Sequence, residues 1–177
     1  MEIKRLEREA YAGKRFTARY QTGGYYDISP AEEGFQITYT PFETPVEWSF
    51  DDVFFGEWLE KPVAFGAFED GRLIGYVEGS LETWNGRFRI SNICLFDSGE
   101  RRRGVGTMLM AVIQKEAAAS GARMIVLETQ SCNEAAIGFY RKNGFDLYAY
   151  SNTDPERHEV RVEMGKKLQQ SEQEVRI

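Results

Sequence analysis

The sequence predicts one α/β domain of the α+β kind, with a mixed, mostly antiparallel central sheet flanked by helices. Three observations carry this prediction: Asp-Gly and Asn-Gly turn signals between apolar runs, a helical repeat after residue 104, and a chain of 177 residues without a domain-splitting linker. A chain near this size buries roughly 70% of its unfolded surface, which suffices for one core. We therefore take residues 1–177 as a single domain, with a variable part over 1–50 and a core over 63–164.

The first fifty residues are expected to be irregular β or loop material. Short aromatic and β-branched runs at 15–20, 34–40 and 46–50 are interrupted by Gly-Gly, Ser-Pro and Thr-Pro pairs, which are turn signals. The stretch from Ser49 then predicts a short helix that ends before Pro62, because a residue preceding proline disfavours the helical conformation.

Three successive antiparallel strands are predicted next. The apolar runs 63–69 and 73–81 flank Asp70-Gly71, and an Asn-Gly pair precedes the run 88–96. Such dipeptides adopt the positive φ angles that tight hairpins require. The middle of the chain is thus expected to be a meander.

Two helices are predicted in the second half of the chain. Apolar residues recur at helical spacing over 107–120, and Gly121 suits the position just after a helix end. Asn133 is a plausible N-cap for a second helix, which runs to Lys142.

The remaining strands are expected around the second helix. A short apolar strand over 124–127 precedes it, and the runs 145–150 and 158–164 form a closing pair. The polar tail from Gly165 is expected to be frayed or lightly packed.

Composition and charge exclude several classes of protein. A formal charge of −6 and a pI near 5.0 argue against a nucleic-acid binder, and favour an enzyme for cationic substrates. The N-terminus shows no apolar leader and no stretch approaches a membrane span, so a cytoplasmic protein with reduced Cys94 and Cys132 is expected. His158 has no spaced partners, so no metal site is predicted.

A glycine-rich basic segment follows the run 88–96. It reads Arg101-Arg-Arg-Gly104-Val-Gly106, and its glycines can turn backbone N–H groups toward one point at a helix N-terminus, where a diphosphate is favoured. The third glycine of a dinucleotide fingerprint and the Lys-Ser or Lys-Thr of a P-loop are both missing. The alternative is a basic surface loop that merely turns tightly.

A second motif weighs against this alternative. It contains Asn133, Ala135, Ala136, Phe139, Tyr140, Gly144 and Phe145. In order and spacing, the two motifs together resemble the GNAT superfamily of N-acetyltransferases. The resemblance covers roughly residues 63–164 and implies acetyl-CoA as cosubstrate, with a sheet splayed where the cofactor binds. Arg102 stands where many members have a second glycine.

The resemblance also implies which residues bind acetyl-CoA. The strand ending at Phe96 offers backbone groups to the pantetheine arm, and the glycine segment binds the diphosphate. The matching residues are Cys94, Leu95, Phe96, Arg101, Arg102, Arg103, Gly104, Val105, Gly106, Thr107, Asn133, Ala136, Phe139, Tyr140 and Lys142. Asn133 could equally serve only as a helix cap, and Lys142 as a solvated helix-end lysine.

Three residues are candidates for proton transfer. Tyr140 is the expected general acid, since a phenol with a reference pKa of about 10 is protonated at neutral pH and matches a departing thiolate; the alternative is a core aromatic. An ammonium acceptor must lose a proton, and Glu78 or Glu82 could take it. Their alternative is cross-strand pairing with Arg87 or Arg89.

The acceptor is expected to be a small cationic amine. The stretch 76–93 resembles streptothricin acetyltransferases, which acetylate an amine of a cationic antibiotic. Other amines, such as a polyamine or a protein amine, and a module that only binds acetyl-CoA remain alternatives, and a homodimer is compatible with the predicted edge strands. A set of acidic and aromatic residues could bind a cation, or it could form an ordinary solvated face. Trp84 could also line the acceptor site. The set comprises Glu32, Glu33, Glu43, Glu47, Asp51, Asp52, Glu57, Glu60, Trp48, Phe54, Phe55 and Trp58.

Overall fold

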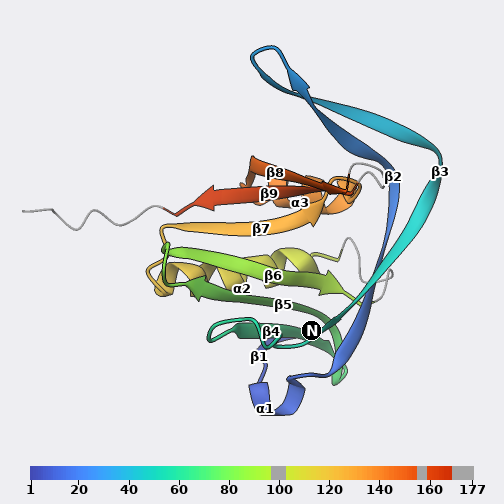
Figure 1. Cartoon of the computed structure of the whole chain (residues 1–177). Helices are drawn as coiled ribbons and strands as arrows, with labels where there is room; N and C mark the ends of the chain where they lie inside the picture. Colours follow the sequence, from blue (N-terminus) through green and yellow to red (C-terminus); the bar gives the residue numbers. More distant parts are fainter. Residues whose placement is uncertain (97–102, 155–158, 169–177) are drawn as a thin grey trace, which may run out of the picture.

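The computed structural model describes residues 1–96, 103–154 and 159–168 (Figure 1). Its elements are β1 (Glu2–Arg5), α1 (Arg8–Tyr11), β2 (Arg15–Ala31), β3 (Gly34–Val53), β4 (Val63–Glu69), β5 (Arg72–Glu82), β6 (Arg87–Leu95), α2 (Val105–Ala119), β7 (Met124–Gln130), α3 (Glu134–Lys142), β8 (Asp146–Asp154) and β9 (Glu159–Lys167). A seven-stranded sheet has the order β1-β4-β5-β6-β7-β9-β8, and β2 pairs with β3 in a separate ribbon. Of the described pairs only β6 with β7 is parallel, so the predicted fold class is confirmed.

The prediction that the first fifty residues are irregular is wrong. Residues 15–31 and 34–50 form most of the β2–β3 ribbon. The Gly-Gly pair is absorbed as a bulge between Thr22 and Gly24, where a Cβ on Gly24 would lie 2.4 Å from the carbonyl oxygen of Thr40. Prolines are tolerated because each strand of a two-stranded ribbon has one unpaired edge. The Gly-Gly pair and the prolines, which usually end a strand, therefore lie inside two long strands.

The helix predicted between Ser49 and Pro62 is wrong. Residues 49–53 complete β3 and pair with β2, and Phe55 then has a φ of 54°. Phe54 and Phe55 are buried in a small core beneath the ribbon, together with Phe16 and Tyr76. Strand pairing and the burial of these rings outweigh the weak helical pattern.

The predicted meander is confirmed as β4, β5 and β6. Asp70 and Gly71 have φ angles of 50° and 78°, which are the two positive values of a type I′ hairpin turn. Gly86 has a φ of 67° in the next connection. The short N-terminal elements β1 and α1 were not predicted from the sequence.

Helices α2 and α3 confirm the predicted helical segments. The buried side of α2 carries Val105, Leu109, Met110, Ile113 and Ala117, and the helix packs against β4, β5 and β6. Gly121 follows with a φ of 76°. None of the described helices is long and apolar enough to cross a membrane.

The closing strands are longer than predicted, and β9 lies between β7 and β8. Gly165 is not in a frayed tail, since it pairs with Val126 and β9 continues to Lys167. His158 lies outside the described residues.

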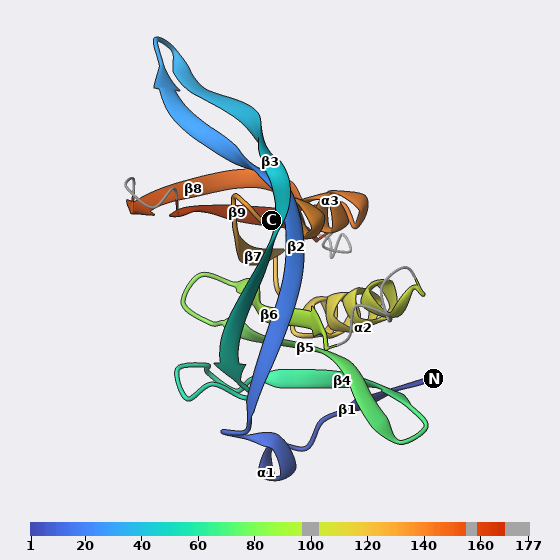
Figure 2. The ribbon, with the colours of Figure 1, turned by 90° about the vertical axis from the view of Figure 1, so that its right-hand side faces the viewer.

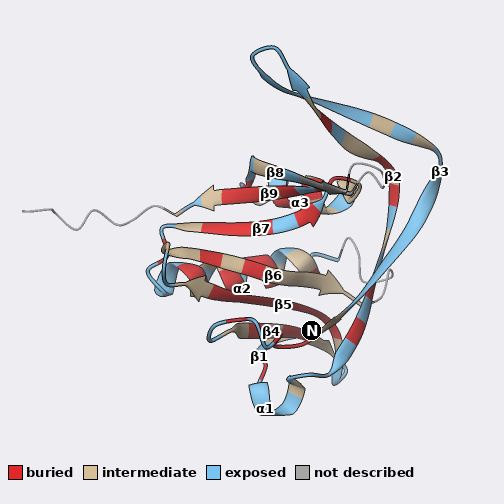
Figure 3. Cartoon of the chain, viewed as in Figure 1, coloured by how far each residue is buried: buried red, intermediate tan, exposed pale blue. Residues whose placement is uncertain are grey.

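The β2–β3 ribbon crosses the body near the C-terminal ends of β6 and β7 (Figure 2). The ring of Phe16 in β2 lies 5.8 Å from that of Phe96, just after β6. Further along β2, the hydroxyl of Tyr20 lies 3.6 Å from the sulfur of Cys132, just after β7. Buried residues concentrate in the central strands, whereas β3 is exposed along most of its length (Figure 3).

Candidate active site

The parallel strands β6 and β7 separate partway along their length. They pair only over Arg87–Ile90 and Met124–Leu127, although both strands continue beyond these residues. Ser91 is an extra residue in β6, because Ile90 pairs with Gly79 and Asn92 with Glu78. A bulge bends the strand that carries it, so β6 turns away from β7 at this point (Figure 1). This is the predicted splay.

Among the described residues, nothing pairs with one backbone edge of the separated part of β6. The N–H of Phe96 donates to the carbonyl of Ile74 in β5, with an N–O distance of 3.0 Å. Backbone groups alternate in direction along an antiparallel strand, so Cys94 and Phe96 direct theirs to β5 while Ile93 and Leu95 direct theirs outward. Of Cys94, Leu95 and Phe96, which were predicted to bind the pantetheine arm, Leu95 therefore offers the free backbone groups. Ile93 was not predicted as a residue of this open edge. The alternation of backbone groups shows which residues face the edge only once the register of the strand is known.

The first turn of α2 is open to an anion. Gly104 is the N-cap, with a left-handed φ of 81°, and no side chain within the described residues caps the helix. The first-turn N–H groups belong to Val105, Gly106 and Thr107, and only the side chain of Val105 is buried. A Cβ on Gly106 would lie 3.4 Å from the ring of Phe139, so this turn lies against α3. A helix N-terminus with uncapped amides and no bulky side chains fits a diphosphate.

The arginines before α2 contribute differently from the expectation. Arg101 and Arg102 lie outside the described residues. Arg103 donates to both carboxylate oxygens of Glu69, at 2.8 and 2.5 Å, and these hydrogen bonds lower the pKa of Glu69. Lys142 is exposed at the end of α3.

The start of α3 is fixed by two side chains. The Oδ1 of Asn133 accepts from the N–H of Ala136 at 3.2 Å, which confirms the predicted cap. Glu134 ties the helix to the ribbon by accepting from the N–H of Gly23 at 3.0 Å and from the hydroxyl of Tyr39 at 2.5 Å. No local sequence signal indicates this contact, because it joins residues that are 95 or more positions apart.

Tyr140 is both a core aromatic and a protonated phenol. Its side chain is 7% exposed and its ring lies 6.2 Å from that of Phe145. Burial raises the pKa of Tyr140, and the neighbouring Cys94 raises it further.

Glu78 is fully buried, and the arginines expected as its alternative partners, Arg87 and Arg89, pair with Glu82 instead. The Oε2 of Glu78 accepts from the N–H of Phe55 at 2.7 Å and from the hydroxyl of Tyr76 at 2.9 Å. The hydroxyl of Ser91 can donate to the backbone oxygen of Glu78 at 3.2 Å or to its Oε1 at 3.4 Å. Burial raises the pKa of Glu78, and the charge of Asp52 adds to this effect.

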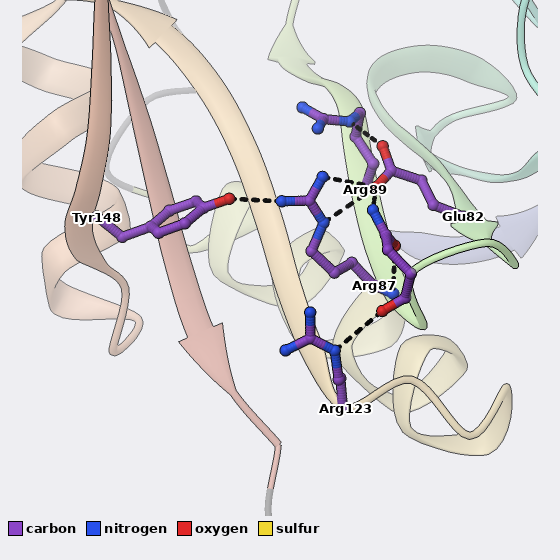
Figure 4. Close-up of polar contacts among 6 residues, drawn as sticks. Glu82, Arg87, Arg89, Arg123 and Tyr148 are labelled. Carbon is purple, nitrogen blue, oxygen red and sulfur yellow. Dashed lines mark hydrogen bonds and ion pairs between the residues drawn. The ribbon is translucent and has the colours of Figure 1, made fainter.

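Glu82 shows the cross-strand pairing that was the alternative to a catalytic role (Figure 4). It lies 2.5 Å from the Nε of Arg89 and 3.1 Å from the Nε of Arg87, and Asn85 donates to it at 2.8 Å. Burial alone would raise the pKa of Glu82, but these donors and their charges lower it. The cluster lies where β6 begins, at the other end of the strand from Phe96.

Trp84 belongs to that same end of β6. It is 79% exposed, and the guanidinium of Arg87 lies 5.7 Å from its ring centre. Trp84 therefore covers an arginine and does not line the splay.

The acidic and aromatic set does not form one surface. Phe54 and Phe55 are buried, and Glu32 and Glu33 lie at the turn of the ribbon. Asp52 does reach the splay, since its Oδ2 accepts from the side-chain amide of Asn92 in β6 at 2.9 Å. Among the described residues, no group of three or more His, Cys, Asp and Glu could hold a metal ion.

Comparison with known proteins agrees with this geometry. A streptothricin acetyltransferase of Streptomyces lavendulae is 27% identical over 145 residues, covering 77% of this chain and 76% of its own length. One of Escherichia coli is 30% identical over 132 residues, covering 71% and 72%.

Solved structures show the same fold. A nourseothricin acetyltransferase has a TM-score of 0.75 at 24% identity and covers 94% of this chain and 97% of its own. A Bacillus anthracis protein in complex with acetyl coenzyme A has a TM-score of 0.72 at 21% identity, with coverage of 95% and 98%. The model of the acetyltransferase (GNAT) family matches residues 31–145, and the chain therefore belongs to this family.

Proposed function

We propose that this protein transfers an acetyl group from acetyl-CoA to an amine of streptothricin or a closely similar cationic antibiotic. One observation carries the proposal: within the described residues, β6 has an unpaired edge at Leu95 where it has separated from β7, and nine residues later the chain forms the uncapped helix N-terminus at Gly104. The first can bind an amide-containing arm and the second a diphosphate. Coenzyme A contains both groups.

The residues present fit this cosubstrate. The N–H groups of residues 105–107 would hold the diphosphate, and the outward backbone groups of Ile93 and Leu95 would pair with the pantetheine arm. The side-chain amide nitrogen of Asn133 would complete the contact, since its Oδ1 already caps α3. When bound, acetyl-CoA supplies an acetyl group activated as a thioester.

Tyr140 is the proposed general acid. Burial holds its pKa above the ordinary value, so the phenol keeps its proton at neutral pH. A departing thiolate has a pKa near 8.5 and needs a proton as it leaves. The O–H of Tyr140, which comes from α3, would donate that proton to the sulfur.

Glu78 is the proposed final proton acceptor, reached through Ser91. The carboxylate is fully buried and cannot touch an acceptor directly. Ser91 is partly exposed at the bulge, and rotation of its hydroxyl from the backbone oxygen of Glu78 to Oε1 directs its hydrogen to the carboxylate. Its oxygen can take a proton from the acceptor ammonium while its own hydrogen passes to Glu78. A raised pKa brings a carboxyl group closer to the working pH, as a general base requires.

The relatives support the choice of acceptor. Two of them are named streptothricin acetyltransferases and match more than two thirds of this chain. A lysine-like amine also agrees with the net charge of −6. Glu82 is given no catalytic role, because two arginines hold its carboxylate.

The test is mass spectrometry of streptothricin incubated with the protein and acetyl-CoA, with release of free thiol measured in parallel. The expected result is a mass increase of one acetyl group, matched by one thiol per product. Spermidine and a lysine-containing peptide are run beside it. Product only from one of these would contradict the antibiotic as substrate, and coenzyme A binding without thiol release from any amine would indicate a binding module.

A further inference from the structure

One face of the ribbon looks onto the splay. Residues directly opposite in an antiparallel pair share a face, and Phe16, Ala18 and Tyr20 lie opposite Asp52, Phe50 and Trp48. Phe16 contacts Phe96 after β6, and Tyr20 contacts Cys132 after β7. The side chains of Trp48, Phe50 and Asp52 are therefore on the side of the ribbon that faces the separated strands.

The two strands of the ribbon are buried to different degrees on this face. Phe16 and Ala18 of β2 are 8% and 4% exposed, whereas Phe50 and Trp48 of β3 are 40% and 43% exposed. The body thus packs against β2, while the side chains of Trp48 and Phe50 in β3 stay partly open to solvent. Two aromatic side chains that face the body and remain exposed are available to a ligand.

Asp52 is a fixed carboxylate at the inner end of this aromatic pair. Its Oδ1 accepts from the N–H of Val53 at 2.8 Å, and its Oδ2 accepts from Asn92 at 2.9 Å. A carboxylate offers about four lone-pair sites, so acceptor capacity remains. The side chain is only partly buried.

The charge of Asp52 acts on the centre of the site. Asn92, which donates to Asp52, pairs with Glu78 across β5 and β6. Burial raises the pKa of Glu78 and of Cys94, and the charge of Asp52 adds to both effects. Cys94 in turn affects Tyr140. Asp52 therefore reaches β6 from the ribbon, whereas Tyr140 belongs to α3.

We propose that Asp52 binds an ammonium group of the acceptor and that Trp48 and Phe50 flank the rest of the cation, so that β3 determines the preference for cationic amines. This inference rests on the proposed function, and it assigns the acceptor contacts of the same site. An ammonium group forms strong hydrogen bonds to a carboxylate and is attracted to aromatic faces. A neutral amine of the same shape gains neither contribution in full.

Asp51 provides a matched control. It is the neighbouring residue and carries the same charge, but it lies on the opposite face of the ribbon, where Thr17 donates to it at 2.5 Å. Asp51→Asn and Asp52→Asn therefore change the net charge equally. Similarly, Trp58 is 68% exposed and lies outside the ribbon, so Trp58→Ala controls for Trp48→Ala.

The experiment measures KM and kcat for streptothricin and, by calorimetry, the affinity for streptothricin and for coenzyme A separately. We expect Asp52→Asn to raise both KM and the streptothricin Kd by roughly tenfold to a hundredfold, with a smaller change in kcat and an unchanged coenzyme A affinity. Trp48→Ala should raise the streptothricin Kd by roughly threefold to tenfold. Asp51→Asn and Trp58→Ala should behave as wild type.

Two results would overturn the inference: equal streptothricin Kd values in wild type and Asp52→Asn, or equal losses in Asp51→Asn and Asp52→Asn. A third outcome is that no product forms although the streptothricin Kd still depends on Asp52. This outcome would contradict the proposed transfer reaction but would support the binding site. Thermal unfolding of each variant shows whether the fold is kept. If Asp52→Asn is unstable, Trp48→Ala and the exposed Phe50→Ala test the same face.

Discussion

Tyr76 donates its hydroxyl hydrogen to the buried carboxylate of Glu78, at 2.9 Å, in the small core beneath the ribbon. Both groups are removed from water, and burial raises the pKa of each. The bonds from Tyr76 and Phe55 favour the charged carboxylate but do not outweigh its desolvation. Ionisation of Glu78 is therefore less favourable in the folded protein than in the unfolded chain.

Glu78→Gln should remove a pH-dependent loss of stability. Because the folded pKa of Glu78 is raised, its favourable contribution is fully present below the unfolded pKa and is lost as pH rises through the folded value. Glutamine can keep the bonds from Phe55 and Tyr76 without ionising. Urea unfolding from pH 4 to pH 8 should show the variant gaining stability relative to wild type as pH rises. A stability difference between variant and wild type that stays constant over this pH range would contradict ionisation of a buried Glu78.

Glu82→Gln should show the opposite pH dependence. The folded pKa of Glu82 is lowered, so its contribution is present above the unfolded pKa and is lost as pH falls through the folded value. Losing charge-assisted bonds to Arg87 and Arg89 should cost about 1–2 kcal/mol near pH 7. Urea unfolding over the same pH range measures this loss of stability, which should become smaller as the pH falls. Glu128→Gln, which removes an exposed pair with Arg161, should cost about 0–1 kcal/mol.

The parts of the fold that were predicted correctly depend on local sequence. Asp70-Gly71 sets its own turn, and α2 shows its buried side as a helical repeat. The ribbon depends instead on pairing between distant residues, such as Phe16 with Asp52, and no short window contains that information. Within the pattern that resembles a weak helix after Ser49, residues 49–53 are extended because their partner strand lies thirty or more residues earlier.

The same distinction applies to the site. Gly104, Asn133 and Tyr140 lie within two continuous motifs, so their places could be predicted. Asp52 was visible only as one of many acidic residues, because its selection depends on a contact with Asn92 across the fold. The outward direction of Leu95 required the register of β6, and a bulge at Ser91 shifts that register by one residue.

Ser91→Ala should lower turnover by about the same factor as Glu78→Gln. If the proton reaches Glu78 through the hydroxyl of Ser91, either change interrupts one route, and the expected loss in kcat is on the order of 10²-fold. Steady-state rates from pH 6 to pH 9 should show the remaining activity rising with pH, since free amine then becomes more abundant. The double variant should be no slower than either single variant. Independent, multiplying losses would contradict a shared route.

Gly104→Ala should weaken coenzyme A binding, whereas Gly121→Ala should not. Both glycines have left-handed φ angles, 81° and 76°, and at either position an added Cβ would meet no atom within 4 Å among the described residues beyond its chain neighbours. Each alanine should therefore cost about 1 kcal/mol of stability. Gly104 alone shapes the first turn of α2, so only its replacement should raise the coenzyme A Kd, by roughly threefold to tenfold. Calorimetry with equal losses in both variants would contradict a diphosphate site at this helix end.

Tyr140→Phe should lower kcat by about 10²-fold or more while leaving the coenzyme A Kd unchanged. The ring stays packed against Phe145, and only the proton donor is lost. Because burial raises the pKa of Tyr140, wild-type kcat should not fall through ionisation of this phenol below about pH 10. Tyr148→Phe provides the control, since that hydroxyl accepts from Arg87 at the far end of β6. Single-turnover thiol release measures the step directly, and an undiminished rate in Tyr140→Phe would remove the phenol from the reaction, leaving it as a core aromatic.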